Sequence, residues 1–179
     1  LIGIARMSTK GKVSARDLDD IIAMGERTSA RIFAAALRSL GAEALCIDPG
    51  QEEWPVVTDS DFGSANIDLA ETRRRVQRYI LPLLERRVIP VICGFLGKDR
   101  QGNITTIGRG GSDTTGFLIG KCMDADEVVM VTDVDGVMSA DPNKIKESRL
   151  IEKISVEEMR ELARFGVQVM NPRAMDYKD

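Results

Sequence analysis

Apolar residues recur at helical spacing over residues 15–40, and this pattern predicts one long helix or two. The apolar positions of this segment are Ile21, Ile22, Met24, Ile32, Phe33, Ala36, Leu37 and Leu40. Gly25 interrupts the pattern at a cost of about 1 kcal/mol relative to alanine, so it indicates close packing or the close approach of a ligand. Gly41 is expected to end the helix.

Two further segments have helical periodicity. Residues 68–87 place Val76, Ile80, Leu83 and Leu84 on one face, and Asp68 is the expected N-cap. Near the C-terminal end, Ser155 stands three residues before Glu158, the spacing of a capping box, and the helix that follows is predicted to reach about Phe165.

Short apolar runs between these helices predict strands at residues 42–47, 88–95 and 127–133, with an edge strand at residues 55–59. The second run is almost wholly apolar, as in a strand covered on both faces, and the third is expected to be a buried strand too. Strands that alternate with helices predict an α/β fold: a three-layer sandwich with a mainly parallel sheet and helices on both faces.

The composition narrows the function. With 179 residues, 43% of them hydrophobic and 30% charged, the chain is predicted to fold as a single domain. The formal net charge of -3 argues against a nucleic-acid partner, and the arginine run at residues 73–75 is interpreted as a solvated helix face. No apolar run reaches the roughly 20 residues that span a membrane, so we expect a cytoplasmic protein without a membrane partner.

The chain contains three cysteines in no metal-binding spacing, and no histidine. We therefore expect neither a structural zinc site nor disulfides, and Cys46, Cys93 and Cys122 are interpreted as small buried apolar residues. Nucleophilic mechanisms that need an imidazole base are excluded within this chain.

The segment TTIGRGGSDTTGFLIG, residues 105–120, combines glycines, hydroxyls, Arg109 and Asp113 just before a predicted helix. Glycines allow backbone N–H groups to approach an anion, and a helix N-terminus adds further donors. Arg109 can fork onto a carboxylate or phosphate, and Asp113 can handle a proton or position a cation. The alternative is an ordinary turn in which Ser112 or Asp113 caps the helix.

Two other segments are candidates for binding. At the end of the strand predicted at 127–133, Thr132 and Asp133 are placed to hold magnesium or a ribose, unless they form an ordinary acidic turn. Glu26 lies within an apolar helix, where it is either exposed, paired with Arg27 or Arg31, or directed at an amino group.

Together, four segments resemble the amino-acid kinase family and, within it, the aspartate kinases: MGERTSARIFAAALRSLG, TTIGRGGSDTTG, VTDVDGVMSADPNKI and ISVEEMRELARFGVQVMNPRAM. They stand in the family's order and cover most of the chain from about residue 19. The resemblance implies transfer of the ATP γ-phosphoryl group to the side-chain carboxylate of L-aspartate, which gives 4-phospho-L-aspartate in lysine, threonine and methionine biosynthesis. It also implies Mg²⁺ held mainly by the nucleotide, and a homodimer.

By position, the resemblance implies that Glu26 meets the substrate amino group and that Arg109 clamps a substrate carboxylate. Gly110, Ser112 and Asp113 would line the reacting centre, with Arg109 and Asp113 the candidate catalytic residues. The implied nucleotide-binding residues are Thr132, Asp133, Met138, Asn143 and Gln168. Residues up to about 115 would form the substrate-binding part, and residues from about 116 to 179 the nucleotide-binding part.

The chain departs from the family pattern in several places. It contains no KFGGTS-like lysine segment and no ACT domain, and Met138, Asn143 and Gln168 stand where the family usually has tyrosine, arginine and lysine. We therefore expect a fragment of a longer protein with little activity by itself. Two alternatives remain: a kinase of the same fold for glutamate, acetylglutamate, carbamate or UMP, or a non-catalytic module that senses a nucleotide or an amino acid.

Overall fold

The computed structural model describes residues 13–131, 136–140 and 145–164. Helix α2, Ala15–Ser39, is a single helix that continues through Gly25. Ser14 forms a capping box with Asp17, and Gly41 follows the helix with a φ of 86°. The predicted end of this helix is therefore confirmed.

The buried face of α2 differs from the expected one. Its buried residues are small or polar: Asp19, Ala23, Ala30 and Ala34. Ile32, Phe33 and Leu40 are exposed instead, so their assignment to an apolar core face was wrong. Alanines let the helix backbone pack closely against the strands β1, β2 and β4, whereas Ile32, Phe33 and Leu40 each remain at least 60% exposed.

The second predicted helix forms as three joined pieces: α3 Leu69–Arg75, the π-helical turn η1 Val76–Ile80, and α4 Leu81–Glu85. Asp68 caps it as expected, because its side chain accepts a hydrogen bond from the Glu71 N–H. The wider π turn comes just before Pro82, which has no N–H and whose ring would clash with a carbonyl four residues earlier. Val76 and Ile80 are fully buried.

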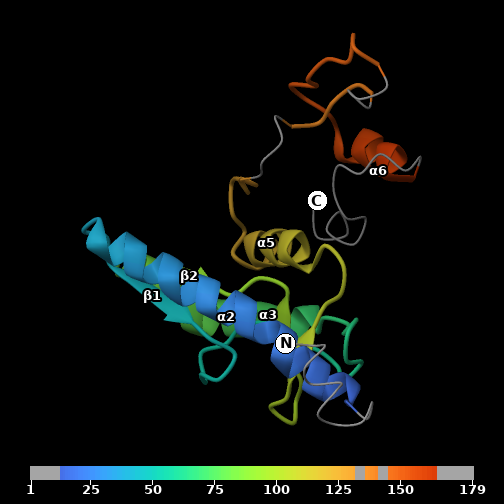
Figure 1. Cartoon of the computed structure of the whole chain (residues 1–179). Helices are drawn as coiled ribbons and strands as arrows, with labels where there is room; N and C mark the ends of the chain where they lie inside the picture. The colour runs from blue at the N-terminus through green and yellow to red at the C-terminus, as the bar shows by residue number, and fades with distance from the viewer. Residues whose placement is uncertain (1–12, 132–135, 141–144, 165–179) are drawn as a thin grey trace.

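The strands form two small two-stranded sheets, and Figure 1 shows β1 and β2 beside α2. Strands β1 Ala44–Ile47 and β2 Ile89–Ile92 pair in parallel, with the helical segment 69–85 in their crossover connection. Strands β3 Leu96–Lys98 and β4 Ile104–Thr106 form an antiparallel hairpin, and Val57 in the predicted edge strand makes only an isolated bridge to Lys98. The hairpin leads directly to α5, Gly111–Cys122.

The strand predicted at residues 127–133 is not formed by its described part, residues 127–131. Val129 is 70% and Val131 95% exposed, and neither pairs with another described strand. An apolar run becomes a strand only when a neighbouring strand offers it hydrogen bonds. Strand β2 is also less covered than expected, since Ile89 is exposed and the rest of the strand is half-buried.

The core is built around Trp54, which is fully buried and donates an indole hydrogen bond of 2.8 Å to the Val56 carbonyl. The arginine run beside it is only partly solvated, contrary to the expectation. Arg73 donates to the Lys121 carbonyl and pairs with Asp124, and Arg75 donates to the Trp54 carbonyl at 2.7 Å. These contacts join α3 to the end of α5 and to the loop that carries Trp54.

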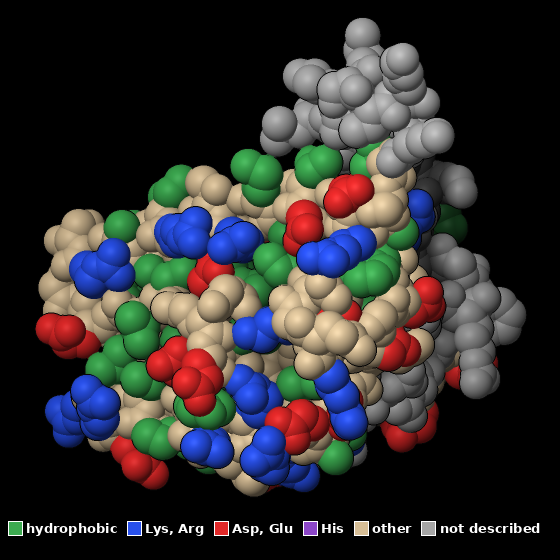
Figure 2. Space-filling view, turned by 90° about the horizontal axis from the view of Figure 1, so that it is seen from below, with side chains coloured by type: hydrophobic (Ala, Val, Ile, Leu, Met, Phe, Trp, Pro, Cys, Tyr) green, Lys and Arg blue, Asp and Glu red, His purple; other side chains and the backbone are tan. Residues whose placement is uncertain are grey.

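The last described helix is α6, Val156–Arg164, and its predicted capping box between Ser155 and Glu158 is present. On the face shown in Figure 2, basic and acidic side chains alternate with apolar ones, so no extended patch of one sign is visible there. None of the described helices is both long enough and apolar enough to span a membrane.

Candidate active site

The glycine-rich loop joins the end of β4 to the start of α5. Gly108 and Gly110 have φ values of 80° and 70°, a region that other residues rarely adopt, and Gly110 is the N-cap of α5. The alternative in which Ser112 or Asp113 caps the helix was therefore wrong, and both lie in its first turn. A Cβ at Gly111 would stand 2.6 Å from the Phe95 ring, so only glycine permits this close start.

This arrangement presents backbone donors and a cation at one place. No side chain caps the N-terminus of α5, and the first N–H groups of a helix have no partner within the helix. The side chain of Arg109 is exposed between the two left-handed glycines, and Asp113 is half-buried one turn further on. The loop can therefore bind an anionic group while a carboxylate stands nearby.

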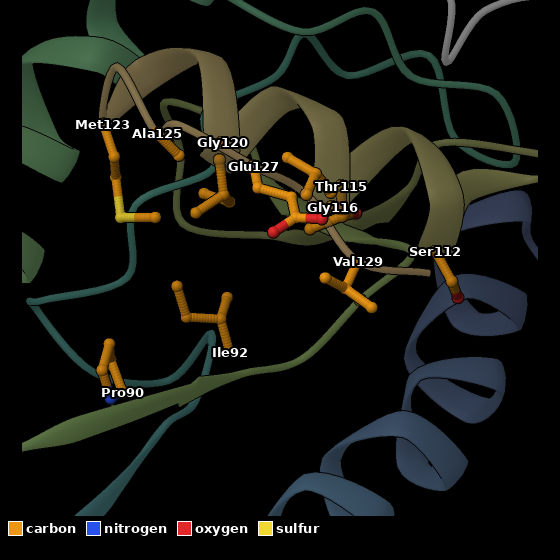
Figure 3. A pocket seen from close by; sticks show the side chains of 13 residues that line it. Pro90, Ile92, Ser112, Thr115, Gly116, Gly120, Met123, Ala125, Glu127 and Val129 are labelled. Atoms are coloured by element: carbon orange, nitrogen blue, oxygen red, sulfur yellow. The ribbon is translucent and has the colours of Figure 1, made fainter. Parts of the chain in front are cut away.

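Ser112 stands over the end of β2. A Cβ placed on Gly94 would lie 3.3 Å from the Cα, Cβ and Oγ atoms of Ser112, so Gly94 allows the helix start to approach the strand end. Both residues line a cleft of about 400 Å³ between β2, α5 and residues 125–129. Figure 3 shows Ser112 at one end of α5, Met123 at the other, and Ile92 facing them from β2.

Glu26 borders a second, smaller hollow of about 180 Å³ between α2 and the end of β2. This hollow shares Ile92 and Gly94 with the cleft that Ser112 lines. The fold thus brings the half-buried Glu26 and the start of α5 to two adjoining hollows, although they are more than 80 residues apart in the sequence.

The expected pairing of Glu26 with Arg27 or Arg31 is not formed. Both arginines bind Asp48 at the end of β1 instead, with N–O distances of 2.8 and 2.9 Å. Burial opposes the ionisation of Asp48, but hydrogen bonds from Arg27 and the Gly50 N–H, with the charges of both arginines, lower its pKa below the ordinary value of 3.8. Glu26 therefore does not compete for these arginines.

The thiols carry no evident chemistry. Burial raises the pKa of Cys93 to about 12, and it also raises the pKa of Cys122, so both are neutral thiols. Cys93 and Cys122 are buried as predicted, whereas Cys46 is only half-buried. Within the described ranges, no three acidic or thiol side chains are grouped to hold a metal ion.

The predicted nucleotide-binding residues are mostly outside the described residues: Thr132, Asp133, Asn143 and Gln168. Met138 is described. Met138 forms an antiparallel bridge with Leu150, which is flanked by hydrogen bonds from the Ser139 and Ile151 N–H groups. Met138 lines neither of the two hollows. Arg109, Gly110 and Asp113 line neither hollow either, and lie at the start of α5 beside Ser112.

Sequence reasoning missed three residues that build this site. Asp19 binds the end of β4, Gly94 admits Ser112, and the Thr115 hydroxyl accepts a hydrogen bond of 3.0 Å from the Phe95 N–H. Only Asp19 could have been found from the sequence. It precedes Ala23 by four residues and Glu26 by seven, so the three residues share one helix face.

Comparison with known proteins identifies the family of this chain. The family model described as "Amino acid kinase family" matches residues 4–179. The chain is 38% identical over 177 residues to an aspartate kinase of Pseudomonas putida, which covers 99% of this chain and 41% of that protein. It is 36% identical to aspartokinase 1, chloroplastic, of Arabidopsis thaliana, over 98% of this chain and 30% of that protein.

Solved structures show the same likeness. The chain superposes with a TM-score of 0.87 and 29% identity on E. coli aspartokinase III in complex with aspartate and ADP, over 98% of this chain and 38% of that one. An aspartate kinase from Synechocystis gives a TM-score of 0.75 at 25% identity, over 98% of this chain and 28% of that one. The chain thus spans well under half of these relatives, and the predicted α/β fold class is confirmed. On the family model and these relatives, the chain belongs to the amino acid kinase family.

Proposed function

We propose that this protein takes part in the transfer of the ATP γ-phosphoryl group to the side-chain carboxylate of L-aspartate. The observation that carries this proposal is that Glu26 and Ser112, in the first turn of α5, line adjoining hollows that share Gly94. The backbone likeness to an aspartokinase structure titled as a complex with aspartate and ADP supports the same assignment.

In this proposal Glu26 binds the ammonium group of L-aspartate, and Arg109 forks onto a substrate carboxylate. Ser112, Gly110 and Asp113 line the reacting centre, where backbone donors at the start of α5 meet negative charge. An oxygen of the substrate side-chain carboxylate attacks the γ-phosphorus, and the bond from that phosphorus to the β–γ bridging oxygen breaks, which releases ADP. A carboxylate is already ionised at neutral pH, so the absence of histidine is no obstacle.

The nucleotide is assigned to Thr132, Asp133, Met138, Asn143 and Gln168 in the part of the chain from about residue 116, with the substrate-binding part before it. Mg²⁺, bound mainly by the nucleotide, would neutralise phosphate charge. We further propose that the product, 4-phospho-L-aspartate, feeds lysine, threonine and methionine synthesis in the cytoplasm, and that the protein acts as a homodimer.

Two alternatives are tested alongside. A kinase of the same fold for another acceptor would bind glutamate, acetylglutamate, carbamate or UMP in place of L-aspartate. A sensing module would bind a ligand without turnover. Asn143 and Gln168 favour it, because they stand where the family usually has the basic residues arginine and lysine. An amino-acid sensor would ignore MgATP in a titration.

The test is calorimetric titration of L-aspartate into this chain, with and without MgATP. We expect saturable binding that Arg109→Ala weakens by about tenfold or more, because a bidentate charged contact is lost. Arg86→Ala, a change of another exposed arginine, serves as the matched control and should leave the affinity unchanged. Equal binding by the Arg109→Ala variant would contradict the assigned site, and binding of another acceptor alone would contradict the substrate.

A further inference from the structure

A buried carboxylate lies at the base of the glycine-rich loop. Asp19 in α2 is only 1% exposed, yet no lysine or arginine pairs with it among the described residues. Its two oxygens accept three hydrogen bonds, from the Gly63 N–H at 2.9 Å, the Thr106 N–H at 2.8 Å and the Thr106 hydroxyl at 2.9 Å. Burying a carboxylate is costly unless such donors surround it, so this site is built for one.

The groups that Asp19 binds lie on both sides of Gly108. Thr106 is the last residue of β4, two positions before Gly108. Gly63 and Ser64 pack against Gly108 from the other side, since a Cβ there would stand 3.3 Å from the Ser64 Oγ and 3.5 Å from the Gly63 carbonyl oxygen. The Asp19 carboxylate thus binds both segments that flank the start of the loop, namely the end of β4 and the segment with Gly63.

The same helix face carries Glu26. Asp19, Ala23, Glu26 and Ala30 follow one another at spacings of four, three and four residues, which places them on one side of α2. Asp19 and Glu26 are separated by about two helical turns, roughly 10 Å along a stiff helix. Contact of Asp19 with Thr106 therefore ties the loop that carries Arg109 to the helix that carries Glu26.

We propose that Asp19 is a positioning residue, whose carboxylate sets the start of the loop 107–113 relative to Glu26 so that both engage one substrate molecule. This inference rests on the proposed function for the substrate. The loop needs such an anchoring contact because Gly108 and Gly110 are compatible with many backbone conformations, and no side chain caps α5. A carboxylate offers two acceptor oxygens and an amide only one, so an asparagine here could not accept all three of these hydrogen bonds.

The experiment compares Asp19→Asn with Asp20→Asn, a change of the neighbouring exposed carboxylate. Amide hydrogen exchange is measured over residues 104–114 and, as an internal reference, over residues 76–92. L-Aspartate affinity is measured by calorimetry on the same samples. We expect Asp19→Asn to raise exchange over 104–114 and to weaken aspartate binding, each by about tenfold, with the reference unchanged and Asp20→Asn without effect.

Unchanged exchange over 104–114 would overturn the proposal, and so would faster exchange with unchanged aspartate affinity. If Asp19→Asn does not fold, Thr106→Val decides, because it removes one of the three hydrogen bonds at nearly constant shape. For Thr106→Val we expect the same two changes, each by about threefold. If neither quantity changes, the proposal is overturned. If the unchanged chain binds no aspartate, the proposed function fails, while the exchange result still decides whether Asp19 holds the loop.

Discussion

At the scale of single residues, buried carboxylates that gather donors from distant segments organise this molecule. Asp48, at the end of β1, accepts hydrogen bonds from Arg27, Arg31 and the Gly50 N–H. It thereby joins α2 to the loop after β1. Breaking a pair of this kind is costly because charges remain behind, although both arginines here still reach water.

We expect Asp48→Asn to lower the free energy of unfolding by about 2 kcal/mol at pH 7. The folded-state pKa of Asp48 lies below 3.8, so its contribution is complete above about pH 4 and is lost as the pH falls through the folded-state pKa. Urea unfolding at pH 7 and at lower pH should show the gap between the two proteins closing in acid. A gap that stays constant, or an equal loss for the exposed Glu85→Gln, would contradict this role.

Glu26 shows how much can be predicted for a single residue from the sequence. Its place on an amphipathic helix follows from the apolar spacing, and the structure keeps it half-buried on α2. Pairing with an arginine, one of the alternatives for Glu26, does not form, because Asp48 binds Arg27 from 21 residues away in the chain through the packing of β1 on α2. A local sequence pattern cannot reveal a competing partner, such as Asp48, that is distant along the chain.

At the scale of elements, the helices and the strands β1 and β2 were predicted, whereas β3 and β4 were not anticipated and the strand at 127–133 is not formed in its described part. The ends of α2, α3 and α6 follow from capping residues that lie within a few positions of each other. Strands depend on partners elsewhere in the chain, and the apolar run at 127–131 has none among the described strands. The π turn at η1 was missed, although Pro82 beside it was visible in the sequence.

Gly25 in the middle of α2 allows a test of function at this scale. A Cβ there would meet nothing within 4 Å, so the close-packing explanation for this glycine fails in the described structure and ligand approach remains. We expect Gly25→Ala to raise the unfolding free energy by up to about 1 kcal/mol and Tm by about 2–4 °C, because alanine favours the helix. We also expect weaker aspartate binding, because the added methyl group stands next to Glu26.

Thermal unfolding and calorimetry on the same sample measure both effects. Thr28→Ala is the matched control, since it also replaces an exposed residue of α2 by a better helix former and should stabilise without changing affinity. If Gly25→Ala stabilises the chain and binds aspartate as tightly as before, this glycine has no role in ligand approach.

At the scale of the whole molecule, the large apolar side chains that are at least 60% exposed among the described residues lie in two segments. One is α2 with Ile32, Phe33 and Leu40, and the other contains Val129 and Val131. Exposed apolar surface of this kind favours association with other protein surfaces. We expect the proposed homodimer to use the segment at 129–131, which is the less covered of the two, with Val131 at 95% exposure.

We expect Val131→Lys to weaken self-association about tenfold in sedimentation velocity, because a charge is placed where apolar contact would form. Its unfolding free energy should change by less than about 0.5 kcal/mol, since the side chain is almost fully exposed in the monomer. Ile32→Lys on α2 is the comparison, and it should leave association unchanged. If Ile32→Lys dissociates the protein and Val131→Lys does not, α2 forms the contact between copies, and the segment at 129–131 stays exposed in the dimer.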